Sequence, residues 1–330
     1  MLKSYTLDGI KLVEAPYEES QVLVYIAPTE NEIKSLVTNY LLDEHTLASA
    51  IDPDEISRLE FEPEHAAIIL KRPKNYSSFD ELLFKISTLG IYLFKERIII
   101  VMPEEINIFE PERKHSFAIS SINKVLFKIL SGTIHHFLAH LKVINQISDA
   151  LEQKINASME NRYLLNMFSL QKSLVYYFNG ISYNATLFEK LKLNAGKLGF
   201  TSEELEILDD IIIENSQCLK EAEVYTTILS NLMDARASIV NNNLSILIKR
   251  LTIINIVFLP ITFIASVGGM SEYTVMTEGL PIGLSYLFFM LAMGVVALVT
   301  YIIVKKLGFE TKRKKGLCQI FRIKRQPNKD

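Results

Sequence analysis

The sequence contains few of the residues that mark several common protein classes. Its 330 residues include 2 cysteines, 13 glycines and 10 prolines. This composition excludes a disulfide scaffold, a collagen-like chain and a largely disordered chain. No glycine-rich loop follows a predicted strand, so a nucleotide-binding fold of the familiar kinds is unsupported. No nucleophile motif is present, and we therefore expect neither an enzyme nor an organic cofactor.

Apolar residues and charges are distributed unevenly along the chain. The mean hydropathy is +0.19 although 22% of the residues are charged, so the apolar excess must be concentrated in part of the sequence. Residues 305–330 hold ten basic and two acidic side chains, a formal charge of +8, whereas the preceding 304 residues hold 25 basic and 36 acidic ones, or −11. An acidic body, an apolar region and a basic tail are typical of a membrane protein.

Two uncharged runs, residues 251–267 and 280–304, are candidates for membrane-spanning helices. A helix needs ~20 apolar residues to cross the hydrocarbon core, which the second run supplies alone and the first supplies together with its neighbours. Their position excludes a signal peptide. Basic residues flank the outer ends and the intervening loop has none, so we expect both termini in the cytoplasm. A buried hairpin in a soluble protein is the alternative, and it leaves the flanking charges unexplained.

The remainder predicts an α/β domain followed by long helices. Three β-branched runs bounded by proline, residues 21–26, 66–70 and 97–102, predict strands. A capping box of Thr29 and Glu32 predicts a helix that continues through Leu42.

Two stretches, residues 133–179 and 201–259, lack glycine and proline, which predicts long helices. The second begins at a good N-cap, Thr201, and has no stop signal before the first apolar run. A continuous helix over residues 201–267 would be about 100 Å long and would have to pack against copies of itself or neighbours.

Four polar side chains of the first apolar run share one helix face. At about 100° per residue, Thr252, Asn255, Thr262 and Ser266 fall within an arc of about 80°. Polar groups are costly in lipid, so this face should meet water or protein. It predicts either a pore lining or a helix–helix seam, and a symmetric bundle satisfies both. Neutral hydroxyl and amide oxygens suit an ion that keeps its water shell, as Mg²⁺ tends to.

The residues that end this face carry a family resemblance. The sequence Pro-Ile-Thr-Phe-Ile-Ala-Ser-Val-Gly-Gly-Met-Ser occupies residues 260–271 and precedes the second apolar run and the lysine-rich tail. It resembles the CorA family of divalent-cation channels, which has a Pro-x-Thr-Phe-Ile-Ala stretch and a Tyr-Gly-Met-Asn loop. The resemblance is strong over residues 245–308 and mostly organisational elsewhere. It implies a homopentamer in the plasma (inner) membrane, with an α/β cytoplasmic domain hung on long helices as a funnel.

The resemblance also assigns residues to the pore entrance. Gly269 and Met270 match the Gly-Met of the family loop, whereas Ser271 replaces its asparagine and Gly268 replaces its tyrosine. A serine hydroxyl can still bond a hydration water, but with a shorter reach than an amide. This departure bears on Mg²⁺ specificity and leaves the channel architecture intact. Relatives that transport Zn²⁺ vary the same motif, so the serine does not indicate one ion.

Further into the pore, the resemblance matches Thr262 to the family's pore threonine and places Leu259 and Leu251 at hydrophobic constrictions. Asn255 stands where the family usually has a small apolar residue, which implies a wetter pore at mid-depth. Together with Thr252 and Ser266, these residues are expected to line the path of the ion.

Two acidic positions follow from the same alignment. Asp234 falls at an acidic ring near the cytoplasmic mouth, and Asp210 falls at one half of an intersubunit site where Mg²⁺ closes the channel. The other half should lie near Leu47, Ala48 and Ser49, where the family shows Leu-Glu-Asp. The partner carboxylate is therefore missing. Alternatively, Asp210 belongs to a solvated helix face beside Asp209.

Two other groups have local interpretations. His135, His136 and His140 cluster on a predicted helix, but no cysteine or carboxylate completes a four-ligand metal site, so a solvated or subunit-facing pair is favoured. The basic tail adjoins a span and should bind anionic lipid headgroups rather than nucleic acid.

These observations together predict six segments: a cytoplasmic α/β domain (1–120), long cytoplasmic helices (121–245), a pore-lining span (246–268), an external loop (269–279), a second span (280–304) and a basic cytoplasmic tail (305–330). We expect a channel for divalent cations, most simply Mg²⁺ uptake. The alternatives are Zn²⁺ transport, a channel of the same fold opened by a nucleotide second messenger, as in type III CRISPR defence, and a non-conducting membrane scaffold.

Overall fold

The computed structural model describes residues 1–9, 11–76, 82–106, 117–157, 161–269, 275, 279 and 281–306. The chain divides into two compact units, Met1–Asp234 and Ala235–Asp330. One helix, α6 (Ser202–Gly268), belongs to both of them.

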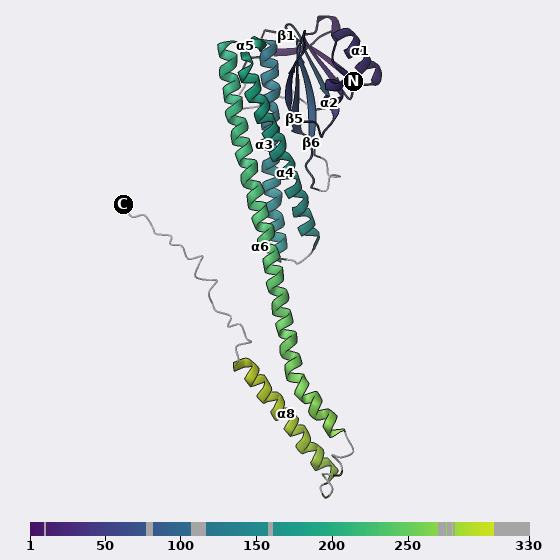
Figure 1. The fold of residues 1–330 in the computed structure, drawn as a ribbon, viewed down its shortest axis with the longest axis vertical. Helices are drawn as coiled ribbons and strands as arrows, with labels where there is room; N and C mark the ends of the chain where they lie inside the picture. The colour runs from purple at the N-terminus through teal and green to yellow at the C-terminus, as the bar shows by residue number, and fades with distance from the viewer. Residues whose placement is uncertain are drawn as a thin grey trace, which may run out of the picture. The chain divides into compact units, whose positions relative to one another are not determined.

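A seven-stranded sheet forms the centre of the first unit (Figure 1). Its order is β2-β1-β3-β7-β6-β5-β4, and among the described strands β3 and β7 pair in parallel while the other neighbours are antiparallel. The strands are β1 (Leu2–Asp8), β2 (Lys11–Glu14), β3 (Val22–Ile26), β4 (Arg58–Phe61), β5 (Ala66–Pro73), β6 (Ile86–Leu93) and β7 (Ile98–Met102). The three predicted strands are confirmed as β3, β5 and β7, whereas β1, β2, β4 and β6 were not predicted.

Helices cover both faces of this sheet, which makes the unit an α/β domain as expected. Successive strand side chains point to opposite faces. In β3, Val22 and Val24 pack with the core beneath the long helices, and Leu23 and Tyr25 pack with the core beneath the short ones. The short helices are α1 (Glu30–Tyr40) and α2 (Glu44–Ile51), and the long ones are α3 (Ile122–Ala157), α4 (Asn161–Leu193) and the first half of α6. The element list is completed by a 3₁₀ turn, η1 (Tyr17–Glu19), and a short α5 (Ala195–Leu198).

The capping box of α1 is confirmed. The Glu32 backbone N–H donates to Thr29 Oγ1 (3.4 Å), and the Thr29 backbone N–H donates to Glu32 Oε2 (2.7 Å). The helix ends at Tyr40, before the predicted Leu42, because Leu41 adopts a left-handed conformation with φ 55°. A residue in this conformation is a common helix terminus.

The first stretch without glycine or proline contains parts of two helices rather than one. α3 ends at Ala157 and α4 begins at Asn161, both within residues 133–179. Gly180, just beyond that stretch, lies inside α4. A glycine or proline is therefore neither necessary nor sufficient to end a helix in this protein, because packing against the sheet overrides a local cost of about 1 kcal/mol.

The second stretch is a single helix, as predicted. α6 runs from Ser202 to Gly268 and keeps Pro260 inside it. Its start is fixed by Glu204, which accepts from the Thr201 backbone N–H (3.0 Å) and from Ser121 Oγ (2.6 Å) at the start of α3. The second unit contains the remainder of α6 and α8 (Ile282–Lys306).

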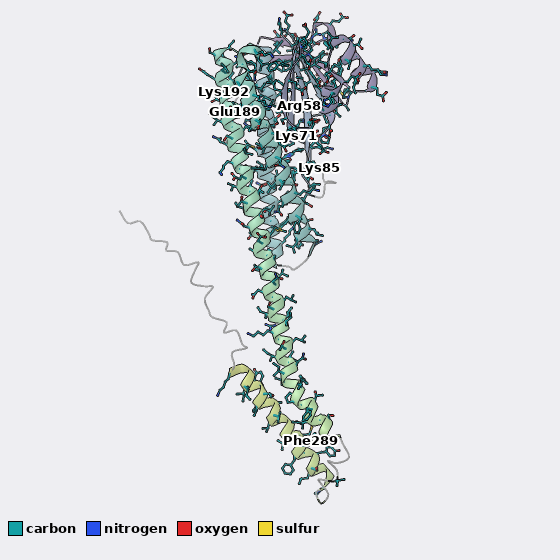
Figure 2. All side chains as sticks on the ribbon, viewed as in Figure 1. Arg58, Lys71, Lys85, Glu189, Lys192 and Phe289 are labelled. Atoms are coloured by element: carbon teal, nitrogen blue, oxygen red, sulfur yellow. The ribbon has the colours of Figure 1, made fainter. Side chains whose placement is uncertain are left out.

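A buried polar cluster joins α4 to the sheet. The Asn184 side chain accepts from the Lys71 backbone N–H (3.0 Å), donates to the Lys71 carbonyl (2.7 Å) and accepts from Ser57 Oγ (2.7 Å). Lys71 itself is buried and its ammonium donates to the Pro53 carbonyl. Lys71 is labelled in Figure 2 beside Arg58 of the neighbouring strand.

Candidate functional site

Two described helices are long and apolar enough to cross a membrane. They are α6, through its C-terminal part, and α8, and the apolar windows of both lie on the surface of the chain. Their large side chains are correspondingly exposed, as Phe258 (60%) and Phe263 (69%) on α6 illustrate. An apolar surface of this extent requires lipid or other protein to cover it.

The polar face predicted on the first apolar run is present on α6. Helical geometry continues through the whole run, so Thr252, Asn255, Thr262 and Ser266 keep their common arc of about 80°. All four residues are exposed in the single chain. The face is therefore available to water, to an ion or to another copy of the chain.

The opposite face of α6 is the one that is covered. Half-buried residues recur there at intervals of three and four: Ile253, Val257, Ile261 and Ile264. On α8 the corresponding stripe contains Ser285, Phe289, Met293, Val296, Ala297 and Thr300. Phe289 is labelled in Figure 2. Both stripes are less exposed than the rest of their helices. At about 100° per residue the polar face lies on the far side of α6 from its half-buried stripe.

The threonine hydroxyls on the polar face have a defined hydrogen-bonding direction. Thr252 Oγ1 donates to the Ile248 carbonyl and Thr262 Oγ1 donates to the Phe258 carbonyl, both at 2.9 Å. A hydroxyl has one hydrogen and two lone pairs. Because the hydrogen is used within the helix, each hydroxyl presents an acceptor outward.

Two leucines lie on or beside the same face. Leu259 is 71% exposed and falls within the polar arc, whereas Leu251 is 60% exposed and lies just outside it. Large apolar side chains at these depths would narrow any passage that the face lines.

The predicted entrance is described only at its first residue. Gly269 ends the helical hydrogen bonding, because its backbone N–H donates to the carbonyls of Ala265 (3.1 Å) and Ser266 (3.3 Å). Met270 and Ser271 lie outside the described residues.

The two acidic positions are both exposed on α6. Asp210 is free of the ion pair that its neighbour makes, since Asp209 Oδ1 lies 2.8 Å from Lys192 Nζ of α4. Asp234 ends the first unit.

The structure does not bring Asp210 and its expected partner region together within one chain. Leu208 and Ile211 of α6 belong to the core on one side of the sheet, whereas α2, which carries Leu47 and Ser49, packs on the other side. The Ser49 hydroxyl donates to Glu55 (3.2 Å) and accepts from Arg58 (2.9 Å). Among the described residues of this region, the serine is committed to an internal ion-pair cluster.

The histidine pair is half-buried in the first unit rather than solvated. His136 Nε2 lies 3.1 Å from His140 Nε2, and His140 Nδ1 lies 2.6 Å from the Tyr177 hydroxyl of α4. Burial lowers the pKa of both rings, and for His136 to about 4, with the charges of His140 and Arg72 contributing. Sequence reasoning missed Tyr177 and Arg72, because neither carries a local motif that indicates a histidine contact. Over the described residues, no group of three or more His, Cys, Asp or Glu side chains could hold a metal.

Comparison with known proteins agrees with this arrangement. A family model described as CorA-like Mg²⁺ transporter protein matches residues 22–306. The cobalt/magnesium transport protein CorA of Methanocaldococcus jannaschii is 23% identical over 273 residues, which cover 79% of this chain and 83% of the relative. The protein of the same description from Thermotoga maritima is 25% identical over 263 residues, covering 76% of this chain and 71% of the relative.

Solved structures show the same fold. The complete structure of the CorA magnesium transporter from Methanocaldococcus jannaschii superposes with a TM-score of 0.74 at 20% identity, covering 94% of this chain and 98% of that one. An α/β domain, long helices and two C-terminal apolar helices define a class of membrane transport proteins. The chain belongs to the CorA-like Mg²⁺ transporter family, because that family model matches most of its length. It is accordingly a membrane protein with two C-terminal spanning helices.

Proposed function

We propose that this protein is a channel that conducts divalent cations, Mg²⁺ foremost, into the cytoplasm. The observation that carries this proposal is the exposed polar face of α6, which lies opposite the half-buried stripe of the same helix. Family membership supports the transport of a divalent cation, and the two relatives are described as cobalt/magnesium transport proteins. Co²⁺ is therefore included among the ions to be tested.

The outward acceptors suit a hydrated dication. Mg²⁺ dehydrates reluctantly, and the water molecules around it direct their hydrogens outward. Thr252 and Thr262 present oxygen lone pairs because their hydrogens are bound to helix carbonyls. Asn255 adds an amide oxygen between them. Such a face binds the water shell without stripping it and carries no charge that would trap the ion.

A homopentamer would turn the polar face into a closed pore. In this arrangement the α6 helices surround the axis, the α8 helices form an outer ring, and Leu251 and Leu259 make two apolar constrictions. Gly269, Met270 and Ser271 would form the external entrance. The first unit would lie in the cytoplasm, with Asp234 near the pore mouth. The basic tail would lie there too, against anionic headgroups.

The test is Mg²⁺ uptake into liposomes that contain the purified chain. Asn255→Leu replaces the mid-pore amide of each subunit by an apolar side chain. We expect the uptake rate to fall by about tenfold or more, because a dry constriction excludes a hydrated ion. The matched control is Ile254→Leu, which places the same side chain one residue away and off the polar face. Equal rates in the wild type and Asn255→Leu would refute this pore, and parallel runs with Co²⁺ and Zn²⁺ identify the preferred ion.

A second reading keeps the pore and changes its control. It is supported by Ala48 and Ser49, which carry no carboxylate to complete a Mg²⁺ site with Asp210, and by the nearby Glu55, whose carboxylate is paired with Ser49 and Arg58. Under this reading the channel opens on binding a cytoplasmic ligand, such as a nucleotide second messenger. Uptake measured with and without cyclic oligonucleotides distinguishes the two modes, because a channel that needs no such ligand conducts equally in both.

A further inference from the structure

Two histidines of α3 converge on one point in the first unit. His136 and His140 are one helical turn apart, their Nε2 atoms are separated by 3.1 Å, and their rings meet edge to face at 73°. The third histidine of the segment, His135, is turned toward the helix backbone, where its Nδ1 lies 2.9 Å from the Ser131 carbonyl. The convergence is therefore specific to one pair.

The ring of His140 is held from behind. Its Nδ1 is 2.6 Å from the hydroxyl of Tyr177, a fully buried residue of α4, and its ring stacks on the Tyr177 ring at 17°. Phe84 contacts the His140 ring edge-on with centroids 5.5 Å apart. In the tautomer that donates Nδ1–H to the Tyr177 oxygen, the Nε2 lone pair faces His136. A metal-binding histidine usually donates its other N–H to an oxygen in this way, which fixes both ring and tautomer.

The two rings are in the protonation state that binds metals. Burial lowers the pKa of both, so at neutral pH each is a neutral imidazole. Arg72 of β5 contributes to the lowered pKa of His136, and its charge is countered by Glu104 Oε1 at 3.3 Å. This ion pair offsets part of the charge of Arg72 that a bound ion would meet.

We propose that His136 and His140 form a two-histidine site for a transition-metal dication such as Co²⁺, Ni²⁺ or Zn²⁺, with water completing the coordination. Metal–imidazole bonds are about 2.0–2.1 Å long, so nitrogens separated by 3.1 Å subtend an angle of about 100° at a shared ion. That angle lies between those of octahedral and tetrahedral coordination. On binding, the ion replaces the N–H···N hydrogen bond: the proton of His136 Nε2 is released to solvent and Nδ1 takes one up, so that the ring stays neutral.

This site would discriminate between divalent cations that an oxygen-lined pore does not distinguish. Imidazole nitrogen suits Co²⁺, Ni²⁺ and Zn²⁺, whereas Mg²⁺ prefers oxygen ligands. The first unit would therefore register a transition metal in a large excess of Mg²⁺. Since the ring of His140 contacts Tyr177, a bound ion would also stiffen the contact between α3 and α4. Metal binding at this site does not depend on conduction, because the site consists only of residues of the first unit.

The experiment is Co²⁺ binding to the detergent-solubilised full chain, followed by calorimetry and by visible absorption of the bound ion. We expect the wild type to retain one nitrogen-ligated Co²⁺ per chain in excess Mg²⁺. His136→Ala and His140→Ala should each weaken this binding by at least tenfold, whereas the matched control His135→Ala should leave it unchanged. Undiminished binding in both alanine variants would overturn the proposal, even if Mg²⁺ uptake proceeds normally.

A second variant guards against misfolding. Tyr177→Phe keeps the ring and removes the oxygen that orients His140, so Co²⁺ affinity should fall about tenfold while the circular dichroism spectrum is retained. If Tyr177→Phe binds Co²⁺ as the wild type does, His140 is not oriented by that hydroxyl and the site as described is wrong.

Discussion

The two units of this protein treat apolar side chains in opposite ways. In the first unit Ile98, Ile99 and Ile100 are each 0% exposed although they are consecutive, because helices cover both faces of the sheet. In the second unit Phe258 and Leu259 are also consecutive, and they are 60% and 71% exposed. The same kind of residue is thus core in one unit and surface in the other.

This difference identifies what each unit needs in order to be stable. The first supplies its own core, so its free energy of folding comes from contacts within the chain. The second has one covered stripe on each helix, and the rest of its apolar surface must be covered by lipid or by other copies. The polar face of α6 is the exception within that surface, and the comparison therefore singles it out as the part adapted to something other than lipid.

The largest expected effect comes from truncating a matched pair of phenylalanines. Phe127 is fully buried and packs edge-on against Phe200, so Phe127→Ala should destabilise the first unit by about 3–5 kcal/mol. Phe258→Ala, at an exposed position of α6, should change the stability by about 0.5 kcal/mol or less. Thermal unfolding of the full chain in detergent, followed by far-UV circular dichroism, measures both. Equal shifts in Tm for the two variants would show that the difference in burial between the units does not translate into a difference in stability.

A smaller effect is expected from acid. His136 is neutral in the folded state with a pKa of about 4, whereas the ordinary value of 6.5 applies once the chain unfolds. Because the unfolded state binds the proton first, stability should decrease as the pH falls from about 6.5 toward 4. The groups that face this ring are His140 of α3 and Arg72 of β5, and His140 in turn faces Tyr177 of α4.

The variant that isolates this effect is His136→Gln, which has no titrating group. Its free energy of unfolding should decline less between pH 7 and pH 5 than that of the wild type, by about 1 kcal/mol or more, and its Tm should fall correspondingly less. His135→Gln is the control on the same helix. Parallel pH profiles for all three proteins would mean that the burial of His136 does not determine the acid response.

The smallest effect is expected at Asp210. If the first unit controlled the second through a Mg²⁺ ion at this position, Asp210→Asn would relieve inhibition by internal Mg²⁺. We expect the inhibition curve to be unchanged within experimental error, because Ala48 and Ser49 carry no carboxylate and the nearby Glu55 is already paired with Arg58. The inhibition curve is measured as liposome uptake at graded internal Mg²⁺ concentrations. A clear rightward shift of the curve in Asp210→Asn would show that the Asp210 carboxylate regulates the channel.

The fold could be predicted where burial is simple. β3, β5 and β7 are buried on both faces, and such strands appear in the sequence as continuous apolar runs. β4 has four residues at the sheet edge, and β6 contains Gly90, so neither gives that signal. Gly90 is required because a Cβ there would lie 2.4 Å from the Ala50 side chain of α2. That close approach depends on the tertiary packing, which a local pattern does not contain.

The candidate sites divide in the same way. The polar face of α6 follows from the helical repeat alone, so four residues sufficed to predict it and the continuous helix confirms their common side. The contact between His140 and Tyr177 joins residues 37 positions apart on different helices. It depends on the pairing of α3 with α4, and the division of that stretch into two helices carries no glycine or proline signal.

The continuity of α6 has a consequence for how this protein can be divided or recombined. The boundary between the units falls after Asp234, inside a helix rather than in a loop. A chain cut there would leave backbone carbonyls without partners on one side and backbone N–H groups without partners on the other. An exchanged first unit would also have to preserve helical phase to the residue, since each residue inserted or deleted would rotate the polar face by about 100°. The two units are therefore constrained to evolve together, because they share one continuous helix whose phase must be kept.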